Sequence, residues 1–357
     1  MSHQIRWLIF VLLKLFKIFT NPLKFTKMNK STYRIAIIGN GKLAKSITLG
    51  LLRAGFRPGQ IIVIGRETSD LEWFSKKVNT SRYMEEIATA SHIIIAVTPV
   101  GCGDTLTRIS KVGLQRLFGY EFISFASGLM PEQISNFIPE SVAHRTISAT
   151  CNTNIAYGSG IVHSTRDSEL LRFLVEDNLL IERKPEKIIN SIVGVGSFNA
   201  LHCVGIDIAK NQSGMTLEKW LNCAENSLSG FNFPEEINQK DPQHVIKEYL
   251  STISIISSRN LNYTISQAEK LTLNTFSSTI SALRTLIKEG VENPTIKLRE
   301  SVVTPGGCTE KGVNKILTSD QLTSRQFMEE EVVVPILNVA NTFPSIVSES
   351  IKKSLRV

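Results

Sequence analysis

Arg34-Ile35-Ala36-Ile37-Ile38-Gly39-Asn40-Gly41-Lys42-Leu43-Ala44 is the stretch that decides the fold of this chain. Its first five residues are mostly apolar and rich in isoleucine, which is typical of a strand buried on both faces of a parallel sheet. A six-residue glycine turn follows, and residues 45–52 then carry the apolar side chains of a helix. Strand, glycine turn and helix in this order predict a dinucleotide-binding unit, with an ordinary βα turn as the alternative.

The small residues of this turn suit the binding of a pyrophosphate. Gly39 permits the sharp turn, and Gly41 has no Cβ that would keep a phosphate away from the backbone. Ala44 takes the place of the third glycine and lets the helix pack closely on the strand. The helix N-terminus offers free N–H groups and a partial positive charge. The turn residues expected to bind the cofactor are Gly39, Asn40, Gly41, Lys42, Leu43 and Ala44.

The end of the second predicted strand, residues 61–64, indicates which nicotinamide cofactor is bound. NAD enzymes usually place an acidic residue here to bind the ribose 2′-hydroxyl, whereas this chain has Gly65 and then Arg66. An arginine beside hydroxyl side chains suits a 2′-phosphate, because it forms charge-assisted hydrogen bonds. A solvated loop arginine is the alternative, which Glu67 keeps open. We therefore predict NADP(H) over NAD, bound by Arg66, Thr68 and Ser69.

Three further buried strands are predicted at residues 92–97, 122–126 and 146–150. In a doubly wound sheet, ligands bind outside the carboxyl ends of the strands. We therefore expect these strand ends to form one crevice with the glycine turn. The cofactor-binding residues predicted there are Val97, Thr98, Pro99, Ser127, Gly128 and Asn152. Residues 160–163 and 179–182 are predicted as additional strands on the edge side.

Beyond Pro185 the pattern changes from alternating strands and helices to helices alone. This order predicts an α/β Rossmann-type N-terminal domain followed by an all-α C-terminal domain. The expected divisions are a basic leader at 1–30, the NADP-binding domain at 31–184, a helical domain at 185–340 with an insertion near 211–249, and a tail at 341–357. Helices are predicted at 188–210 with an interruption at 194–197, at 264–288 with Ser266 and Glu269 as the capping pair, and at 322–339, with a loose end after Pro344.

The composition argues against several classes of function. The 357 residues carry a net charge of +8, yet no Asp or Glu precedes Glu67. The excess charge is therefore assigned to the leader and to an anionic ligand, since basic and aromatic residues do not interleave as they do in a nucleic-acid groove. The five cysteines show no CxxC spacing and no neighbouring His pair. We expect no metal site and a reducing compartment.

Residues 5–19 form an apolar stretch that Arg6, Lys14 and Lys17 interrupt. Its longest uncharged run, residues 7–13, is too short for a membrane span, which needs about 20 residues. A basic amphipathic helix without acidic residues suits contact with a membrane surface or an organelle-targeting presequence. An upstream extension with the native start at Met28 is the alternative, and both remain open. We expect a cytoplasmic or organellar protein that is not secreted.

The order of four motifs resembles that of the pyrroline-5-carboxylate reductase family. These are the glycine turn 39–44, the strand end 96–99, the pair Asn152-Thr153 and the loop Val303-Thr304-Pro305-Gly306-Gly307-Cys308-Thr309. The resemblance extends over residues 33–339, and the Pro-Gly-Gly-x-Thr loop is its most specific part. It implies reduction of a cyclic imine to proline with NAD(P)H. It also implies a helical domain that interleaves with a partner subunit in a homodimer or a higher homo-oligomer.

The resemblance assigns substrate binding to the loop, through Thr304, Gly306, Gly307, Cys308 and Thr309. Backbone N–H groups of a glycine turn at a helix start can bind a carboxylate. Thr309 is the expected catalytic residue, because its hydroxyl can hydrogen-bond the ring nitrogen as hydride arrives at the neighbouring carbon; a helix N-cap is the alternative. A protonated imine needs no strong general acid, so catalysis would consist mostly of positioning. We expect Gly41 and Gly307 to face one another across a single gap.

Several residues depart from the family pattern, including Thr98, Asn154 and Phe198. Thr98 stands where the family usually has Lys, Asn154 replaces the Pro of Asn-Thr-Pro, and Phe198 replaces a glycine of Ser-Gly-Ser-Gly-Pro-Ala-Tyr. The first hypothesis is an NADPH-dependent reductase of a cyclic imino acid, which the intact Pro-Gly-Gly-Cys-Thr loop favours. The second is a relative that binds NADP(H) without turnover and acts as a sensor or interaction protein, which Asn154 and Phe198 favour.

Overall fold

The computed structural model describes residues 32–114, 120–182, 187–228, 244–303, 308–319, 321 and 324–356. The chain divides into two compact units, Met1–Tyr33 and Arg34–Val357. The predicted leader at residues 1–30 lies outside the described residues. The second unit holds every described strand.

The second unit contains one sheet of eight described strands in the order β3-β2-β1-β4-β5-β6-β7-β8. Neighbouring strands are parallel, except that β6 and β7 are antiparallel. Their bounds are β1 (Ile35–Ile38), β2 (Ile61–Ile64), β3 (Asn79–Ser81), β4 (His92–Ile95), β5 (Glu121–Ser124), β6 (Thr146–Cys151), β7 (Gly160–Ser164) and β8 (Val175–Glu182). The predicted strands are confirmed, and β1 lies between β2 and β4, where the sheet changes its direction of winding.

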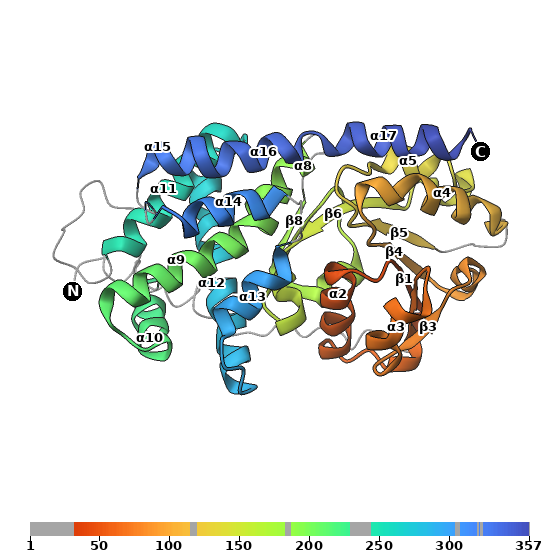
Figure 1. Ribbon diagram of the computed structural model, residues 1–357. Coiled ribbons are helices and arrows are strands. Elements are labelled where there is room, and N and C mark those ends of the chain that lie inside the picture. The colour runs from red at the N-terminus through yellow and green to blue at the C-terminus, as the bar shows by residue number, and fades with distance from the viewer. Residues whose placement is uncertain are drawn as a thin grey trace, which may run out of the picture. The chain divides into compact units, whose positions relative to one another are not determined.

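The isoleucine-rich central strands are buried, as their composition predicted. All four residues of β1 are at most 3% exposed. Figure 1 shows α2 (Lys42–Arg53) on one side of these strands and α4 (Cys102–Lys111) on the other. The alternation of side chains along a strand explains the two covered faces, since Ala36 and Ile38 share a core with Leu106 and Ile109 of α4. The α/β Rossmann-type part of the predicted fold class is confirmed.

The C-terminal half is helical, and its first long helix contains an irregular segment. α8 (Ile188–Ser191), η8 (Ile192–Ser197) and α9 (Phe198–Ser213) run on without a break, where the sequence predicted an interrupted helix. The interruption takes the form of a π-helix, η8, which holds Gly194 and Gly196. Such π segments inside α-helices often lie at functional sites.

The second long helix, α12 (Ile265–Lys288), forms as predicted but begins with a different capping pair. The Thr264 hydroxyl accepts a hydrogen bond from the Gln267 backbone N–H, and the Gln267 side chain accepts one from the Thr264 backbone N–H. The prediction of Ser266 and Glu269 is therefore wrong by two residues. A threonine satisfies the same orphan N–H group as a serine, so composition alone does not locate the first turn.

The segment near 211–249, which was predicted to be an insertion, supplies part of the helical core. It includes α10 (Leu217–Leu228) and the first residues of α11 (His244–Asn260), whereas residues 229–243 lie outside the described residues. Tyr249 and Leu250 of α11 are fully buried in the same core as Phe276 of α12. Helices of this length depend on such packing for their stability.

The C-terminal residues form a packed helix, so the expectation of a loose end after Pro344 is wrong. A run of helix made of α15 (Arg325–Phe327), η9 (Met328–Val333) and α16 (Val334–Ala340) leads to α17 (Phe343–Ser354). Figure 1 shows α17 lying along α4. Val347 is fully buried in the core that α4 shares with the sheet. The backbone N–H of Gly103 in α4 donates to Ser350 Oγ at 3.0 Å.

Two described helical runs, Ile188–Ser213 and Arg325–Ser354, are long and apolar enough to cross a membrane by length and composition alone. The most apolar window of the first is 78% buried and that of the second is 28% buried. Core helices of globular proteins pass the same test. The first run belongs to the helical core, and the second contributes Val347 to the core beside α4.

Candidate functional site

The carboxyl ends of the central strands meet at one edge of the sheet. Backbone hydrogen bonds join Gly39 N to Ile64 O at 2.9 Å and Ala96 N to Ile38 O at 2.8 Å. A third bond joins Phe125 N to Ile95 O at 2.8 Å. The glycine turn after β1 therefore lies directly beside the residues that follow β4. This is the edge at which doubly wound sheets bind ligands.

The glycine turn has the backbone geometry that a pyrophosphate requires. Gly39 has a φ of +118°, and a Cβ there would lie 2.4 Å from the carbonyl oxygen of Ala96, so only glycine fits. A Cβ on Gly41 would meet nothing within 4 Å, which leaves open space above the turn. Ala44 lies in the first turn of α2 and is fully buried. The first turn of α2 contains no acidic residue and its N-cap makes no side-chain hydrogen bond. The turn therefore fits a diphosphate at a helix N-terminus.

A further arginine, Arg82, lies beside Arg66 at the end of β2, and Arg108 in turn contacts Arg82. The Arg82 Nε donates to the Arg66 carbonyl oxygen at 3.3 Å, and an Arg108 Nη donates to the Arg82 carbonyl oxygen at 3.3 Å. Sequence reasoning missed Arg82, because β3 has no apolar run and was not predicted. The signal is that Arg82 directly follows β3, whose Ser81 carbonyl accepts from Gly65 N at 3.1 Å. The side chains of Thr68 and Ser69 are not described, and Thr68 begins α3 (Thr68–Ser75).

The remaining predicted cofactor residues fall into two groups. Val97, Thr98 and Pro99 lie at the crevice edge, where Thr98 precedes the short helix η4 (Pro99–Gly101) and is exposed. Asn152 is instead fully buried: its side-chain oxygen accepts from Ile161 N, and its amide group donates to Ser278 Oγ. The Asn152 side chain thus holds the end of β6 and does not face the crevice.

The loop Ser127-Gly128 also has a structural partner that the sequence did not reveal. Gly128 has a φ of +85°, and a Cβ there would lie 2.6 Å from the backbone carbon of Phe343. The glycine is therefore required by the close approach of the start of α17. Ser127 is partly exposed.

The predicted substrate loop is described only at its two ends. Thr304, Pro305, Gly306 and Gly307 lie outside the described residues, as does the side chain of Cys308. α13 (Pro294–Val302) ends just before the loop, and α14 (Cys308–Leu317) begins just after it. The ammonium group of Lys42 donates to the carbonyl oxygens of Glu300 at 2.7 Å and Val303 at 2.6 Å. The residue that precedes Thr304 is thus held beside the glycine turn.

Thr309 lies in the first turn of α14 and is 7% exposed. Its Oγ1 is 2.9 Å from Ser197 Oγ, at the end of the π-helical segment η8. The start of α14 is therefore fixed to the first long helix of the C-terminal half. The geometry is consistent with a role for Thr309 at the start of its helix and with the predicted contact to a ligand.

A buried network of amides and hydroxyls joins the end of β6 to three helices. The Asn154 amide group donates to Asn199 Oδ1 at 2.9 Å and to Ser278 Oγ at 2.8 Å. Asn199 donates in turn to Thr153 Oγ1, which lies 2.7 Å from Ser301 Oγ in α13. Buried polar groups of this kind specify one arrangement, because each loses hydration unless it is paired. The network links η6 (Thr153–Tyr157) with α9, α12 and α13.

Phe198 does not occupy the crevice. It is fully buried in the helical core, with its ring centre 6.3 Å from that of His202 in an edge-on contact. His202 is itself fully buried between Tyr249 Oη, 2.9 Å from Nδ1, and Thr275 Oγ1, 2.8 Å from Nε2. Burial lowers the pKa of His202 to about 3, so this histidine is neutral at pH 7.

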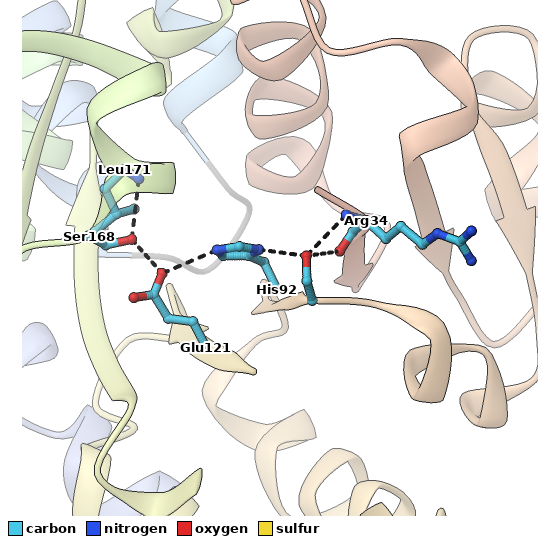
Figure 2. A network of polar contacts seen from close by, with 6 residues as sticks. Arg34, His92, Glu121, Ser168 and Leu171 are labelled. Carbon is cyan, nitrogen blue, oxygen red and sulfur yellow. Dashed lines mark hydrogen bonds and ion pairs between the residues drawn. The ribbon is translucent and has the colours of Figure 1, made fainter. Parts of the chain in front are cut away.

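A network of ionisable side chains lies at the amino ends of the strands, which is the edge of the sheet opposite the glycine turn. Figure 2 shows His92 between Arg34 and Glu121, with Ser168 beyond the carboxylate. His92 and Glu121 are the first residues of β4 and β5 and are paired in register. The His92 Nε2 lies 3.9 Å from a Glu121 oxygen. Ser168 donates to Glu121 and accepts from Leu171 N, so that it caps α7 (Glu169–Leu174). The network therefore organises the amino ends of the strands.

Cys102, Cys151 and Cys203 are buried, and Cys223 is partly buried. Burial raises the pKa of the Cys102 thiol to about 12 and that of Cys151 further, which keeps both as neutral thiols. Within the described ranges no three His, Cys, Asp or Glu side chains gather in a way that could hold a metal ion.

Comparison with known families concerns mainly the first half of the molecule. Residues 34–117 match the model of the family described as NADP oxidoreductase, coenzyme F420-dependent. The matched region runs from β1 to the residues after α4 and includes the glycine turn and Arg66. The match agrees with the predictions of a Rossmann fold, of an oxidoreductase and of NADP as the cofactor. No curated protein matches the chain.

Solved structures with a similar arrangement include two pyrroline-5-carboxylate reductases. The chain is 13% identical to the enzyme of Plasmodium falciparum, solved with NADP bound, covering 88% of this chain and 98% of that one with a TM-score of 0.43. It is 20% identical to the enzyme of Coxiella burnetii, covering 91% and 98% with a TM-score of 0.41. An imine reductase from Myxococcus stipitatus, in complex with NAD⁺, is 13% identical, with coverage of 75% and 99% and a TM-score of 0.34. The chain is similar to pyrroline-5-carboxylate reductases.

Proposed function

We propose that this protein is an NADPH-dependent reductase of a cyclic imino acid of the pyrroline-5-carboxylate type, with a proline-like product. The observation that carries the proposal is the position of Val303 beside the glycine turn, where Lys42 binds its carbonyl oxygen. In the sequence, Val303 leads directly into Thr304-Pro305-Gly306-Gly307. This position supports one site in which a turn suited to a diphosphate lies beside the start of a loop suited to a carboxylate.

The reaction requires little from the protein beyond binding and orientation. NADPH, when bound, supplies a hydride, which adds to the imine carbon while the electrons of the C=N bond move to a nitrogen that is already protonated. The backbone of residues 39–44 would hold the pyrophosphate, and Arg66 and Arg82 would face the 2′-phosphate. Thr309 would contact the ring nitrogen. Holding two reactants in this geometry can account for much of the rate enhancement.

The alternative is a relative that binds NADP(H) without turnover, which Asn154 and Phe198 favoured in the sequence. The position of Phe198 no longer favours it. Phe198 packs inside the helical core and leaves the crevice free. Asn154 still departs from the family pattern: its side-chain oxygen is buried without a hydrogen-bond partner among the described residues. That unpaired oxygen lies in a network that joins helices. We therefore expect it to lower the free energy of unfolding and not to affect the catalysed reaction.

The decisive test is oxidation of proline or thiazolidine-4-carboxylate by NADP⁺ at high pH, the reverse of the proposed reaction. We expect turnover by the wild-type protein, a large loss of turnover in Thr309→Val and unchanged NADPH affinity in that variant. Protein that binds NADPH but turns over neither compound would refute the imino-acid proposal. Loss of NADPH binding in Thr309→Val would mean that Thr309 serves the cofactor or the fold instead.

The expected homodimer remains a proposal that follows from the resemblance. Among the described residues, the large apolar side chains that are exposed are Tyr83, Val100, Ile265, Ile296, Leu317 and Leu355. Size-exclusion chromatography with light scattering would test the homodimer. A cytoplasmic or organellar location and a membrane-surface contact of residues 5–19 likewise remain proposals, which imaging of the chain with and without residues 1–27 would test.

A further inference from the structure

The side chain of Lys42 does not point along its own helix. Lys42 is the first residue of α2 and follows Gly41 directly. Its Nζ lies 2.7 Å from the carbonyl oxygen of Glu300 and 2.6 Å from that of Val303, more than 250 residues away in the sequence. Both acceptors belong to the C-terminal end of α13. One side chain thus connects the nucleotide turn to another helix.

Helix electrostatics explains why a lysine adopts this position. The last carbonyl groups of an α-helix have no partner within the helix, and that end carries a partial negative charge. An ammonium group that reaches two of these oxygens caps the end of α13. At the start of α2 the same charge is unfavourable, because that end carries a partial positive charge. Lys42 is therefore stabilised by its partners on α13 and not by its own helix.

Two neighbouring contacts fix the same part of the molecule by other means. Ser301 Oγ in the last turn of α13 lies 2.7 Å from Thr153 Oγ1, and Thr309 Oγ1 lies 2.9 Å from Ser197 Oγ. These two contacts bind α13 and α14 to the end of β6 and to η8. Of the three, only the Lys42 contact reaches the turn that is suited to the pyrophosphate.

We propose that Lys42 is a positioning residue that holds the C-terminal end of α13 in register with the nucleotide turn. For the nature of the substrate the inference rests on the proposed function; the structural connection does not depend on it. Backbone N–H groups of the turn bind the pyrophosphate, so the loss of the Lys42 amine should leave NADPH affinity nearly unchanged. The residues that continue from Val303 toward Thr309 should be less well placed, which raises the KM for the imino acid more than it lowers kcat.

The test compares Lys42→Met, which keeps the length of the chain without its charge, with Lys42→Arg, which restores a cationic donor. Lys45→Met is the matched control, because Lys45 lies on the same helix with its ammonium 5.4 Å from the Trp73 ring and serves no proposed ligand. Hydrogen exchange of peptides covering residues 296–303 is measured first, on the protein without ligands. We expect faster exchange in Lys42→Met and rates close to the wild type in Lys42→Arg and Lys45→Met.

Steady-state kinetics at saturating NADPH supply the second readout. We expect the KM for the imino acid to rise about tenfold in Lys42→Met, the scale of losing hydrogen bonds to a charged group, with the NADPH Kd changed by less than about twofold. Unchanged hydrogen exchange in Lys42→Met overturns the inference, and so does an NADPH Kd that rises as much as the KM. If the wild type shows no turnover, the proposed function fails, whereas the exchange experiment still decides the role of Lys42.

Discussion

At the scale of single residues, we expect Arg66 and Arg82 to determine which nicotinamide cofactor the crevice prefers. Their guanidinium groups belong to neighbouring strand ends, and Arg82 Nε donates to the Arg66 backbone. Arg66→Ala should weaken NADPH binding by about 10- to 100-fold, the scale of a charge-assisted hydrogen bond, and leave NADH binding nearly unchanged. Fluorescence titration with both cofactors measures this. Equal weakening of the two would exclude contact with the 2′-phosphate.

Residue identity also shows how far the site could be predicted. The glycine turn was predictable, because its signal is local: an apolar strand, a glycine turn and a helix follow one another directly in the chain. Arg82 was not, since its relevance depends on the pairing of β3 with β2. Asn152 was assigned to the crevice from its place after a strand. Its actual partners are Ile161, nine residues later, and Ser278, 126 residues later, and the sequence pattern indicates neither of them.

At the scale of elements, the contact between α17 and α4 allows no side chain at Gly103. A Cβ there would lie 2.1 Å from the carbonyl oxygen of Ser350, which is backbone and cannot rotate away. Gly103→Ala should therefore displace α17 and lower the free energy of unfolding by about 1–3 kcal/mol. Urea denaturation measures the change. Gly59→Ala is the control, because a Cβ there meets nothing within 4 Å. A Gly103→Ala protein as stable as the control would mean that α17 is not docked as described.

Elements were predictable where one chain segment carries its own signal. β1, β2 and β4 are isoleucine-rich and buried, and α12 has an amphipathic pattern of 24 residues. α17 has only a short apolar stripe that includes Val347. Its partner is the face of α4 at Gly103, which lies about 250 residues earlier in the sequence. The sequence pattern does not show that a short amphipathic segment will find such a partner. The same limit explains why β3, with no apolar residue, was missed.

At the scale of the whole molecule, the buried His202 and the partly buried His92 make stability depend on pH. Burial lowers the pKa of His92 to about 4 and that of His202 to about 3, from about 6.5 in the unfolded chain. The unfolded state therefore binds more protons than the folded state below pH 6.5, so stability present at neutral pH is lost as the pH falls toward 4. Burial raises the pKa of Glu121, which opposes part of this loss. The net expectation is a free energy of unfolding that decreases on acidification from pH 6.5 to 4.5.

His92→Asn isolates the contribution of the strand-end network, because asparagine keeps a hydrogen-bonding group beside Ser91 but does not titrate. A histidine that is protonated in the unfolded chain and neutral in the folded protein contributes about 1.4 kcal/mol per pH unit to the slope of the free energy of unfolding. The free energy of unfolding of the variant should therefore decline less steeply on acidification than that of the wild type. Urea denaturation at a series of pH values gives both curves. His202 and its hydroxyl partners remain in the variant and should sustain the residual slope. Parallel curves would mean that His92 is as free to protonate in the folded protein as in the unfolded chain, and that the edge of the sheet opposite the glycine turn is open to water.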